Sequence, residues 1–458
     1  MGKLISINPS RNEVIGEVET STEQDVADAV AKARKAQPKW AALSLTERCE
    51  RIASFIKVAE GRYEEVAKLI ATETGRPIES ARGNVEGGIN YFNGYLETAQ
   101  QYLTPQITYE TDVELHRVYR EPWGVIACIC PWNYPFMNIA WQCGQALIAG
   151  NSVVYKNSEE NPLFAKLLVE LFAASDIPED VFNVVYGDGQ VGEWLANADI
   201  NMISFTGSTQ TGKKLTKIAA EKFIPIVTEL GGSAPLIVFE DKEVTDELVE
   251  FIWGRRFKNA GQSCDAVKRL IVHESKFDSL VERLCKVVDT KKIGDALDED
   301  TDCGPLVAKR QLDKLEDQVK DATDKGAKIE IGGSKPKDLE GIYYLPTIIT
   351  NIRRNMRIWH EEVFGPVLPV ISFSTEEEAI ELANDTEYGL GAHVMTDDEE
   401  LFNKVAHQLQ SGMVAQNKVM YWHPSNPFGG YKQSGMGRTH GEYGFHEVTQ
   451  IKLVSEEK

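Results

Sequence analysis

Residues 225–239 have the sequence Pro-Ile-Val-Thr-Glu-Leu-Gly-Gly-Ser-Ala-Pro-Leu-Ile-Val-Phe. Two short apolar runs, 225–228 and 236–239, flank the segment Glu229-Leu230-Gly231-Gly232. Short apolar runs bounded by turn residues are typical of buried strands. Such strands alternate with helical patterns before this stretch, and the alternation begins again after it. The stretch therefore marks a junction between two α/β domains, and clefts form at such junctions.

The residues before the junction predict a parallel sheet between helices. A capping-box pattern at Ser21–Gln24, followed by Val26, Val30 and Ala33 at helical spacing, predicts a helix start. Further helices are expected over 44–75, 79–100, 163–175 and 209–221. Short apolar strands are expected over 125–130, 152–155, 181–186, 202–205 and 225–228. Strands that alternate with helices imply right-handed crossovers and a parallel sheet.

The same pattern continues after Gly232. Strands are expected over 236–239, 270–273, 328–331, 368–373, 392–395 and 413–416. Helices are expected over 244–258, 275–289, 309–325, 375–385 and 398–410. The acidic run Glu376–Glu378 follows Ser374 and Thr375, which suits a helix N-terminus. Outside this alternation, residues 105–120 alternate polar with apolar as in a hairpin, and a last strand is expected over 448–454.

Composition excludes several classes of protein. A chain of 458 residues with 42% hydrophobic and 26% charged residues is typical of a soluble protein with two or three domains. The net charge of -21 argues against nucleic acid, whose binding needs a basic face, and disfavours anionic membranes. No apolar run approaches the ~20 residues that span a bilayer. We therefore expect neither a nucleic-acid nor a membrane partner.

The cysteines and histidines indicate a reducing, metal-free protein. The seven cysteines are odd in number and thinly spread, with no CxxC pair. Cys128 and Cys130 lie in an apolar stretch and are expected to be buried thiols. This usage favours the cytoplasm over a disulfide framework. The eight histidines have no metal-ligand spacing, so no metal site is expected.

Three residues have the chemistry needed to oxidise a carbonyl carbon. Cys264, in Gly261-Gln262-Ser263-Cys264, is a candidate nucleophile, and it needs a positive environment, a base or a helix N-terminus to become thiolate. Asn133 has a side-chain amide that can donate to a negative oxygen. Glu229 is a carboxylate that can take a proton from water. Without these partners, each residue would be ordinary core, turn or strand-end material.

Seven motifs in order resemble the aldehyde dehydrogenase superfamily, over about residues 5–453. They are Pro131-Trp132-Asn133-Tyr134-Pro135, Lys156-Asn157-Ser158-Glu159, Phe205-Thr206-Gly207-Ser208, Glu229-Leu230-Gly231-Gly232, Gly261-Gln262-Ser263-Cys264, Glu361-Glu362-Val363-Phe364-Gly365-Pro366 and Pro427-Phe428-Gly429-Gly430-Tyr431-Lys432. The resemblance implies NAD(P)-dependent oxidation of an aldehyde to an acid. Cys264 would form a thiohemiacetal and then a thioester, Asn133 would hold the oxyanion, and Glu229 would activate water.

The resemblance also implies a cofactor site. The implied residues are Trp132, Lys156, Glu159, Gly207, Ser208, Gly212, Leu230, Glu362 and Phe364. The spacing Gly207–Gly212 departs from the usual dinucleotide fingerprint, although it follows a predicted strand and precedes a helix. Lys156 and Glu159 would hold the adenosine ribose, and Glu362 and Phe364 the nicotinamide ribose and ring. A glutamate at 159 would repel a 2′-phosphate, which favours NAD, with NADP as the alternative.

The substrate is less well defined. The implied substrate-binding residues are Tyr134, Trp141, Lys258 and Phe428, with Tyr421 and Trp422 nearby. Relatives that take succinate semialdehyde carry arginine where this chain has Trp141, which weakens a carboxylate-tailed substrate. Lys258 and the segment Cys264–Arg269 favour it; the alternative interpretation of Lys268 and Arg269 is that they are only strand-flanking charges. A small semialdehyde such as succinate semialdehyde is therefore one candidate.

Several alternatives stay open beside this function. They are a CoA-acylating aldehyde dehydrogenase or acyl-CoA reductase, a medium-chain or aromatic aldehyde dehydrogenase, an esterase that acts through Cys264, and a non-enzymatic scaffold. The presence of Glu229 disfavours transfer to CoA, because CoA-acylating relatives usually lack it. Full cofactor motifs disfavour the esterase, and the intact set of Cys264, Glu229 and Asn133 disfavours the scaffold.

The resemblance finally implies an aldehyde dehydrogenase-like α/β fold in three parts. Residues 1–102 and 121–231 would form a Rossmann-type dinucleotide-binding domain, and residues 232–444 an α/β catalytic domain. Residues 103–120 and 445–458 would form a small β oligomerisation element, whose strands add to a neighbour's sheet. We expect a homodimer or homotetramer.

Overall fold

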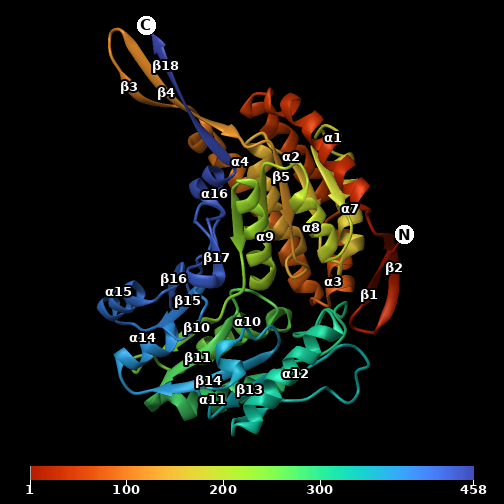
Figure 1. Ribbon diagram of the computed structural model, residues 1–458. Coiled ribbons are helices and arrows are strands. Elements are labelled where there is room, and N and C mark those ends of the chain that lie inside the picture. The colour runs from red at the N-terminus through yellow and green to blue at the C-terminus, as the bar shows by residue number, and fades with distance from the viewer. Residues whose placement is uncertain (1) are drawn as a thin grey trace.

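The computed structural model describes residues 2–458, in which two large sheets stand one above the other (Figure 1). The first sheet has the strand order β17-β9-β8-β5-β6-β7. These strands are β5 (Val125–Ile129), β6 (Ser152–Lys156), β7 (Phe182–Val185), β8 (Met202–Thr206), β9 (Ile226–Glu229) and β17 (Gly435–Met436). All neighbours are parallel except β17 and β9. The predicted parallel sheet is confirmed.

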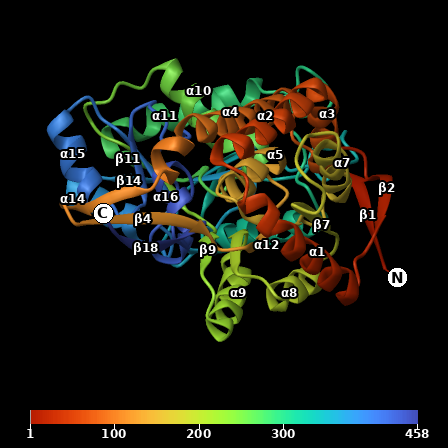
Figure 2. The ribbon, with the colours of Figure 1, turned by 90° about the horizontal axis from the view of Figure 1, so that it is seen from above.

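Helices cover both faces of this sheet because its strands are apolar on both sides. In β5, Ile126 and Cys128 belong to one core, whereas Val125 and Ala127 belong to another. The first core is covered by α2 (Leu45–Gly61), α3 (Tyr63–Thr74), α4 (Ile78–Leu103) and α7 (Pro162–Ala173). The second is covered by α1 (Glu23–Ala41), α8 (Gly189–Asn197) and α9 (Thr209–Lys222), on the opposite side in Figure 2. Between β5 and β6 the chain forms α5 (Pro135–Asn138), a π-helix (Ile139–Gly144) and α6 (Gln145–Ile148).

The second sheet has the order β12-β13-β14-β11-β10-β15-β16 and is parallel except for β12 with β13. Its strands are β10 (Ala234–Val238), β11 (Val267–His273), β12 (Lys328–Ile331), β13 (Thr347–Thr350), β14 (Val367–Phe373), β15 (Gly391–Met395) and β16 (Met413–Gln416). Its helices are α10 (Asp246–Phe257), α11 (Glu274–Thr290), α12 (Lys309–Asp324), α13 (Arg357–His360), α14 (Glu376–Asn384) and α15 (Glu399–Gln408). One apolar core joins them. The mixed α/β fold predicted from the motifs is confirmed.

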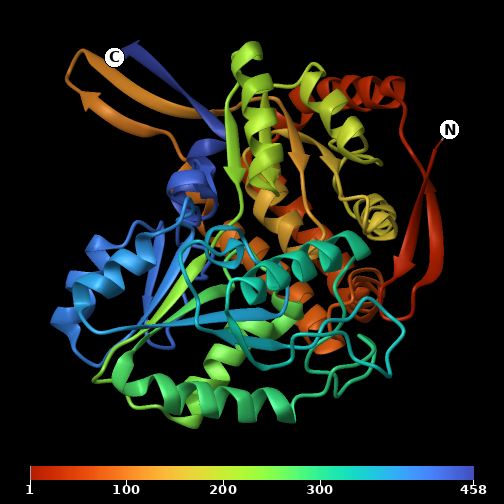
Figure 3. The same ribbon diagram turned by 60° about the horizontal axis from the view of Figure 1, so that its bottom comes forward.

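Two small sheets lie outside these layers. β1 (Lys3–Asn8) and β2 (Glu13–Glu19) form an N-terminal hairpin. β3 (Gln106–Glu110) and β4 (Glu114–Pro122) form the predicted hairpin, which β18 (Thr449–Glu457) extends in the order β18-β4-β3. This three-stranded sheet projects away from the body of the molecule (Figure 3).

The structure corrects several local predictions. The helix predicted to start at Ser21–Gln24 is capped one residue later, where Thr22 and Asp25 form the capping box. Ser21 instead pairs with Tyr186, since its backbone N–H donates to the Tyr186 carbonyl at 2.8 Å. The sequence analysis also missed β13, α8 and the β1–β2 pairing.

The C-terminal part of the chain returns to the first sheet before residue 444. β17 pairs with β9, and α16 (Gly441–Glu447) contacts α4 and α6. Glycine makes the return possible, because Gly435 has φ 141 and a Cβ there would lie 2.0 Å from the Thr228 carbonyl oxygen. The predicted range 232–444 therefore includes a segment that packs on the other sheet. The domain boundaries themselves stay a prediction.

All seven cysteines are unpaired, and Cys128, Cys130, Cys143 and Cys303 are buried. This agrees with the predicted thiols in the apolar stretch. Within residues 2–458 no helix has both the length and the apolar character that crossing a bilayer requires. The cytoplasmic location stays a prediction.

Candidate active site at the junction of the two sheets

The loops that follow β5, β6, β8 and β9 line one cavity of about 840 Å³. Carboxyl ends of parallel strands meet at one edge of a sheet, where ligands commonly bind. The opposite wall comes from the second half of the chain and includes Cys264, Glu362 and α12. A second cavity, of about 1080 Å³, is lined by Tyr134, Lys258 and Ser263. Because Ser263 lines one cavity and Cys264 the other, the predicted nucleophile lies where the two approach each other.

A strained turn determines the path of the Cys264 segment. Asn259, Ala260 and Gly261 have φ values of 55, 51 and 70. Residues other than glycine adopt such left-handed backbone conformations only at a cost in free energy. A Cβ on Gly261 would lie 2.3 Å from the Gly365 carbonyl oxygen, so only glycine fits there. Gln262 holds the turn, since its Nε2 donates to the Asn259 carbonyl at 3.1 Å and its Oε1 accepts from the Val307 N–H at 3.0 Å.

Cys264 is partly exposed, and three carboxyl groups and one ammonium act on its thiol. Burial raises its pKa, Asp265 raises it further, and Lys268 acts in the opposite direction. Glu362 and Glu229 also raise it. In this state the thiol is protonated at neutral pH, so the nucleophile needs a further change in its surroundings to ionise.

Asp265, the next residue, is a buried carboxylate with a complete set of partners. It accepts from Ser263 Oγ at 2.8 Å, from Arg255 at 3.1 Å and from Tyr421 at 3.1 Å. Burial opposes its ionisation, but Arg255 and these donors keep its pKa below the usual range. Asp265 is therefore a fixed anion that Arg255 neutralises.

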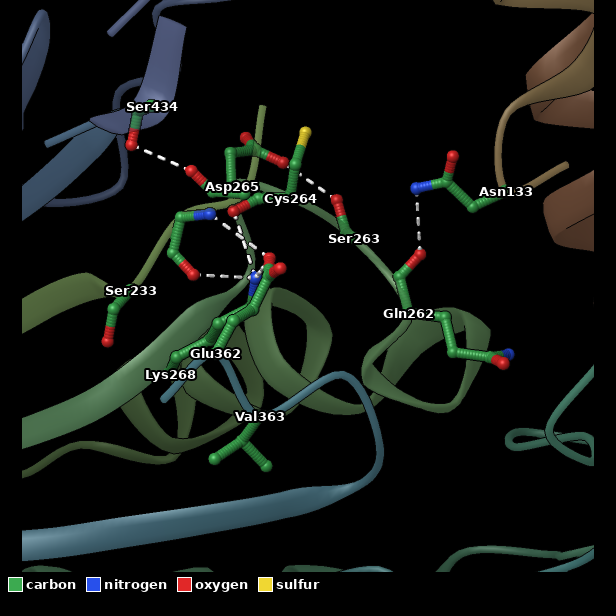
Figure 4. A network of polar contacts seen from close by, with 12 residues as sticks. Asn133, Ser233, Gln262, Ser263, Cys264, Asp265, Lys268, Glu362, Val363 and Ser434 are labelled. Carbon is green, nitrogen blue, oxygen red and sulfur yellow. Dashed lines mark hydrogen bonds and ion pairs between the residues drawn. The ribbon is translucent and has the colours of Figure 1, made fainter. Parts of the chain in front are cut away.

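Lys268, on β11, links three predicted motifs from below the thiol (Figure 4). Its Nζ donates to the Gly232 carbonyl at 2.9 Å and to the Cys264 carbonyl at 3.0 Å. It also pairs with Glu362, whose Oε1 accepts from the Gly232 N–H at 3.1 Å. Lys268 and Arg269 are both buried, and Arg269 bonds to the Ser233 and Ala383 carbonyls. The alternative that these two are only strand-flanking charges is wrong, because both lie within β11 and are buried.

Asn133 reaches toward the same segment from the first sheet (Figure 4). Its Nδ2 donates to the Gln262 carbonyl at 3.1 Å, two residues before Cys264. The backbone carbonyl of Asn133 accepts from Arg76 at 2.5 Å and from the Asn259 side chain at 3.4 Å. The residue is therefore held through both its backbone and its side chain, and the side-chain amide retains a second N–H for another acceptor.

Glu229 ends β9 and is 4% exposed, and neither carboxylate oxygen has a hydrogen-bond partner in the described residues. Burial raises its pKa well above the usual range, with Arg438 opposing and Glu447 adding to the rise. A buried carboxyl without hydrogen-bond donors binds a proton more readily than a solvated one, which suits a base that takes a proton from water.

Eight of the nine predicted cofactor residues line the 840 Å³ cavity together with Asn133 and Cys264. Gly212 does not line it, because it packs behind Leu230. A Cβ added at Gly212 would lie 2.5 Å from the Leu230 side chain. Gly207 likewise has no room for a side chain, since a Cβ would lie 2.5 Å from the Phe205 ring. Ser208 caps α9, accepting from the Thr211 N–H at 3.2 Å, and both residues line the cavity, so the N-terminus of a 14-residue helix lies at its wall.

The sequence analysis missed the contribution of α12. Arg310, Gln311 and Lys314 line the cavity, and Arg310 donates to Glu159 at 2.9 Å and pairs with Glu160 at 2.6 Å. Lys156 lies 4.0 Å from the other oxygen of Glu159. Arg310 is 151 residues from Glu159 in sequence. No local sequence pattern predicts this contact, because Arg310 and Glu159 are brought together only when the two halves of the chain pack against each other.

The predicted substrate residues divide into two groups. Tyr134 and Lys258 line the 1080 Å³ cavity with Trp422, and Arg76 lies over the Tyr134 ring at 4.3 Å. Trp141 and Phe428 do not line this cavity; their rings stack with centroids 6.0 Å apart beside buried His440, and Cys264 packs against the apolar cluster that contains Phe428. Tyr421 does not line this cavity either, and its hydroxyl donates to Asp265.

The family model described as "Aldehyde dehydrogenase family" matches residues 2–454. The chain belongs to this family. The dehydrogenase is 38% identical over 465 residues to a peroxisomal aminoaldehyde dehydrogenase of Pisum sativum, covering 99% of this chain and 92% of the relative. It is 36% identical over 449 residues to mitochondrial succinate-semialdehyde dehydrogenase of Arabidopsis thaliana, covering 98% and 85%.

A solved structure gives the same result. The betaine aldehyde dehydrogenase from Staphylococcus aureus in complex with NAD+ matches with a TM-score of 0.95 and 33% identity, over 99% of this chain and 91% of that chain. The predicted family, the enzyme class of aldehyde dehydrogenase and its NAD(P) cofactor are confirmed. The aldehydes that these relatives are named for differ from one relative to the next.

Proposed function

We propose that this dehydrogenase oxidises an aldehyde to a carboxylic acid through a covalent bond to Cys264. The supporting observation is the position of Cys264 between two cavities, with Asn133, Glu362 and the loops of the first sheet around one of them. At this cavity Gly207 has no room for a side chain, and the N-terminus of α9 lies at the wall. Both features fit a dinucleotide pyrophosphate. A bound nicotinamide there accepts the hydride.

In the proposed reaction the Cys264 thiolate attacks the aldehyde carbon, and the carbonyl electron pair moves to oxygen. Asn133 donates to that oxygen. The pair returns to form a thioester as hydride leaves with its two electrons, so the carbon is oxidised and the cofactor reduced. Glu229 then takes a proton from water, whose oxygen attacks the thioester. The C–S bond breaks, the sulfur recovers its electron pair, and the acid leaves.

Within the cofactor cavity, Trp132 and Leu230 would enclose the dinucleotide, Lys156 and Glu159 would hold the adenosine ribose, and Phe364 would lie at the nicotinamide ring. Glu159 is ionised, because Lys156 and Arg310 lower its pKa against the effect of burial. An anion at this position accepts from ribose hydroxyls and repels a 2′-phosphate. We therefore propose NAD as the preferred cofactor over NADP.

Asn133→Ala is expected to lower kcat about 10²–10³-fold, because one oxyanion donor contributes ~2.7–4 kcal/mol to the barrier. Dissociation of NAD, measured by fluorescence titration, should change little. Asn138→Ala on α5, a buried asparagine of the same segment, is the matched control. A drop in kcat of the same size in both variants would point to loss of structure rather than loss of a donor.

For the substrate we propose a small semialdehyde whose carboxylate tail lies in the 1080 Å³ cavity. Of its charged lining, Arg255 is neutralised by Asp265, Lys418 by Glu247 and Glu250 by Lys291, whereas Glu97 has no ion-pair partner among the described residues. Arg76 and Lys258 line the cavity with Tyr134 and have no carboxylate partner among the described residues, so with Glu97 they leave the lining about one net positive charge. The excess positive charge favours an anionic tail. The aromatic residues around Trp141 favour the second candidate, a medium-chain or aromatic aldehyde.

Lys258→Met is expected to lower kcat/KM for succinate semialdehyde about three- to fivefold, as ~1 kcal/mol is typical of a solvent-screened ion pair. Methionine keeps the length of the side chain, so kcat/KM for uncharged butanal should stay unchanged. Steady-state rates with both aldehydes measure the difference. Equal losses for the two, or a gain for a cationic ω-aminoaldehyde with no loss for the semialdehyde, would contradict the carboxylate tail.

We also propose that β18, β4 and β3 pair with a second copy of this chain. β18 and β3 are the edges of their sheet, and Ile107, Ile451 and Leu453 are all more than half exposed there. Open strand edges with apolar side chains associate readily. Light scattering at micromolar concentration should give the mass of a dimer or tetramer, and deletion of 449–458 should lower it. A monomeric full-length chain would contradict this.

A further inference from the structure

Arg310 of α12 contacts two consecutive carboxylates in the loop that follows β6, in the other half of the chain. Its Nη1 donates to Glu159 Oε1 at 2.9 Å, and its Nη2 pairs with Glu160 Oε1 at 2.6 Å. Arg310 and Glu159 line the cofactor cavity, whereas Glu160 does not. The guanidinium is therefore forked, with one nitrogen on a carboxylate of the cavity and the other on a carboxylate outside its lining.

The loop that carries Glu159 is held by other side chains. Asn157 spans it, since the Asn157 Nδ2 donates to the Asn161 carbonyl at 2.8 Å. Ser158 Oγ accepts from the Glu160 N–H at 3.3 Å, and both Asn157 and Ser158 are buried. Because these bonds do not involve the Glu159 carboxylate, we expect the backbone of the loop to stay in place when that side chain is changed.

A second cation lies near the same carboxylate from the first half of the chain. Lys156 ends β6, its side chain is 6% exposed, and its Nζ is 4.0 Å from Glu159 Oε2. The two charges attract each other at this distance, but it is too long for a hydrogen bond. The ammonium has three donors, so it can accept a further partner in the cavity that it lines.

Glu159 therefore stands between two cations, in the position that a ligand anion would take. The charges of Lys156, Glu159, Glu160 and Arg310 cancel one another. Without the charge of Glu159 the group would be positive, and Arg310 would still be held by Glu160 while its Nη1 became free to donate. Lys156 and Arg310 would then offer donors from two sides. A phosphate monoester, with three strong acceptor oxygens, suits such a pair of cations.

We propose that Arg310 is a specificity-determining residue, which forms with Lys156 a latent site for a 2′-phosphate on the adenosine ribose. Glu159 fills this site as a counter-ion of the protein itself and so excludes NADP. The proposal rests on the proposed place of the adenosine ribose at Lys156 and Glu159. It adds that the preference for NAD depends on a single carboxylate, because the cations that NADP requires are already in position.

The test is calorimetric binding of two nucleotides that differ only in the 2′-phosphate, adenosine 2′,5′-bisphosphate and 5′-AMP. The unmodified protein should bind 5′-AMP more tightly. Glu159→Gln should bind the bisphosphate at least about tenfold more tightly than the unmodified protein does, because charge-assisted hydrogen bonds replace a repulsion. Its affinity for 5′-AMP should change about threefold at most, since glutamine still offers an oxygen to the ribose hydroxyls.

Two further variants assign this gain to Arg310. The double variant Glu159→Gln/Arg310→Met should lose most of the gain for the bisphosphate. The matched control is Glu159→Gln/Lys309→Met, which removes a charge from the same turn of α12 and should keep the gain. Lys309 pairs with Asp313 and lines neither cavity. A Glu159→Gln protein without the gain overturns the proposal. So does an Arg310→Met double variant that keeps it in full, which would assign the phosphate to other cavity lysines such as Lys214.

Arg310→Met alone gives an independent measurement in case the Glu159 variants do not fold. Glu159 then lacks its partner, so the bisphosphate should bind more weakly still, whereas 5′-AMP should change little. An equal change for both nucleotides contradicts the proposal.

Competition with NAD separates this proposal from the proposed function. If neither nucleotide displaces NAD, the proposed cofactor cavity is wrong, and if no aldehyde is oxidised with NAD, the proposed function fails. Displacement of NAD together with dehydrogenase activity, but without a gain that depends on Arg310, contradicts only the latent phosphate site.

Discussion

Cys264→Ala is expected to reduce NADH formation from aldehyde about 10⁴–10⁶-fold, the loss typical of removing a catalytic nucleophile. Alanine leaves the 259–261 turn and both cavities in place, so NAD should still bind with nearly unchanged affinity. Stopped-flow absorbance of NADH measures the first turnover directly. No burst of NADH is expected, because hydride leaves only after carbon has bonded to sulfur.

The control for this variant is Cys285→Ala, a partly exposed thiol on α11 that lines neither cavity. Its activity should be unchanged. Dehydrogenase activity in Cys264→Ala within tenfold of the unmodified protein would exclude the proposed nucleophile, whichever substrate is used. Retained ester hydrolysis in that variant would also exclude an esterase that acts through Cys264.

Glu229→Gln is expected to stop the reaction after one turnover. Glutamine keeps the volume of the buried side chain but cannot take a proton from water, which costs about 10²–10⁴-fold in the hydrolytic step. Thioester formation does not need this base, so one equivalent of NADH per site should appear rapidly before the slow phase. In the unmodified enzyme the slow step should quicken as pH rises, since Glu229 acts only after losing its proton and burial raises its pKa.

The same variant tests the alternative acyl acceptor. If addition of CoA restores steady turnover in Glu229→Gln and stimulates the unmodified enzyme, the chain is a CoA-acylating dehydrogenase. We expect no restoration. Glu240→Gln, an exposed glutamate after β10, is the control and should behave as the unmodified protein. A variant at Glu229 that lacks the burst as well would place this residue earlier in the reaction.

Much of the fold was predictable because its strands are buried on both faces. The apolar runs near 125–130, 202–205 and 392–395 became β5, β8 and β15, since only a covered parallel sheet buries both faces of a strand. Helix starts were less certain. Ser21 and Thr22 both fit a cap, and only the pairing of Ser21 with Tyr186 assigns the cap to Thr22.

The candidate site divides in the same way. The motifs predicted Cys264, Glu229 and Asn133 as the candidate reacting residues, because residue type and local order are properties of the sequence. They did not reveal that Lys268 is buried against Glu362, 94 residues away, or that Arg310 meets Glu159 across the cavity. They also name Trp141 and Phe428 as substrate residues, which stays a prediction: neither lines the 1080 Å³ cavity, whereas Cys264 packs against the apolar cluster that contains Phe428.

The family and most of the strands and helices follow from the amino-acid sequence alone, which also supplies the candidate reacting groups. Those depend on short-range periodicity and on side-chain chemistry, which a chain carries in any conformation. The tertiary structure decided which charges face the thiol and which carboxylate stays without a donor. Such properties arise only when segments distant in sequence are packed together out of water, because burial strengthens each remaining charge.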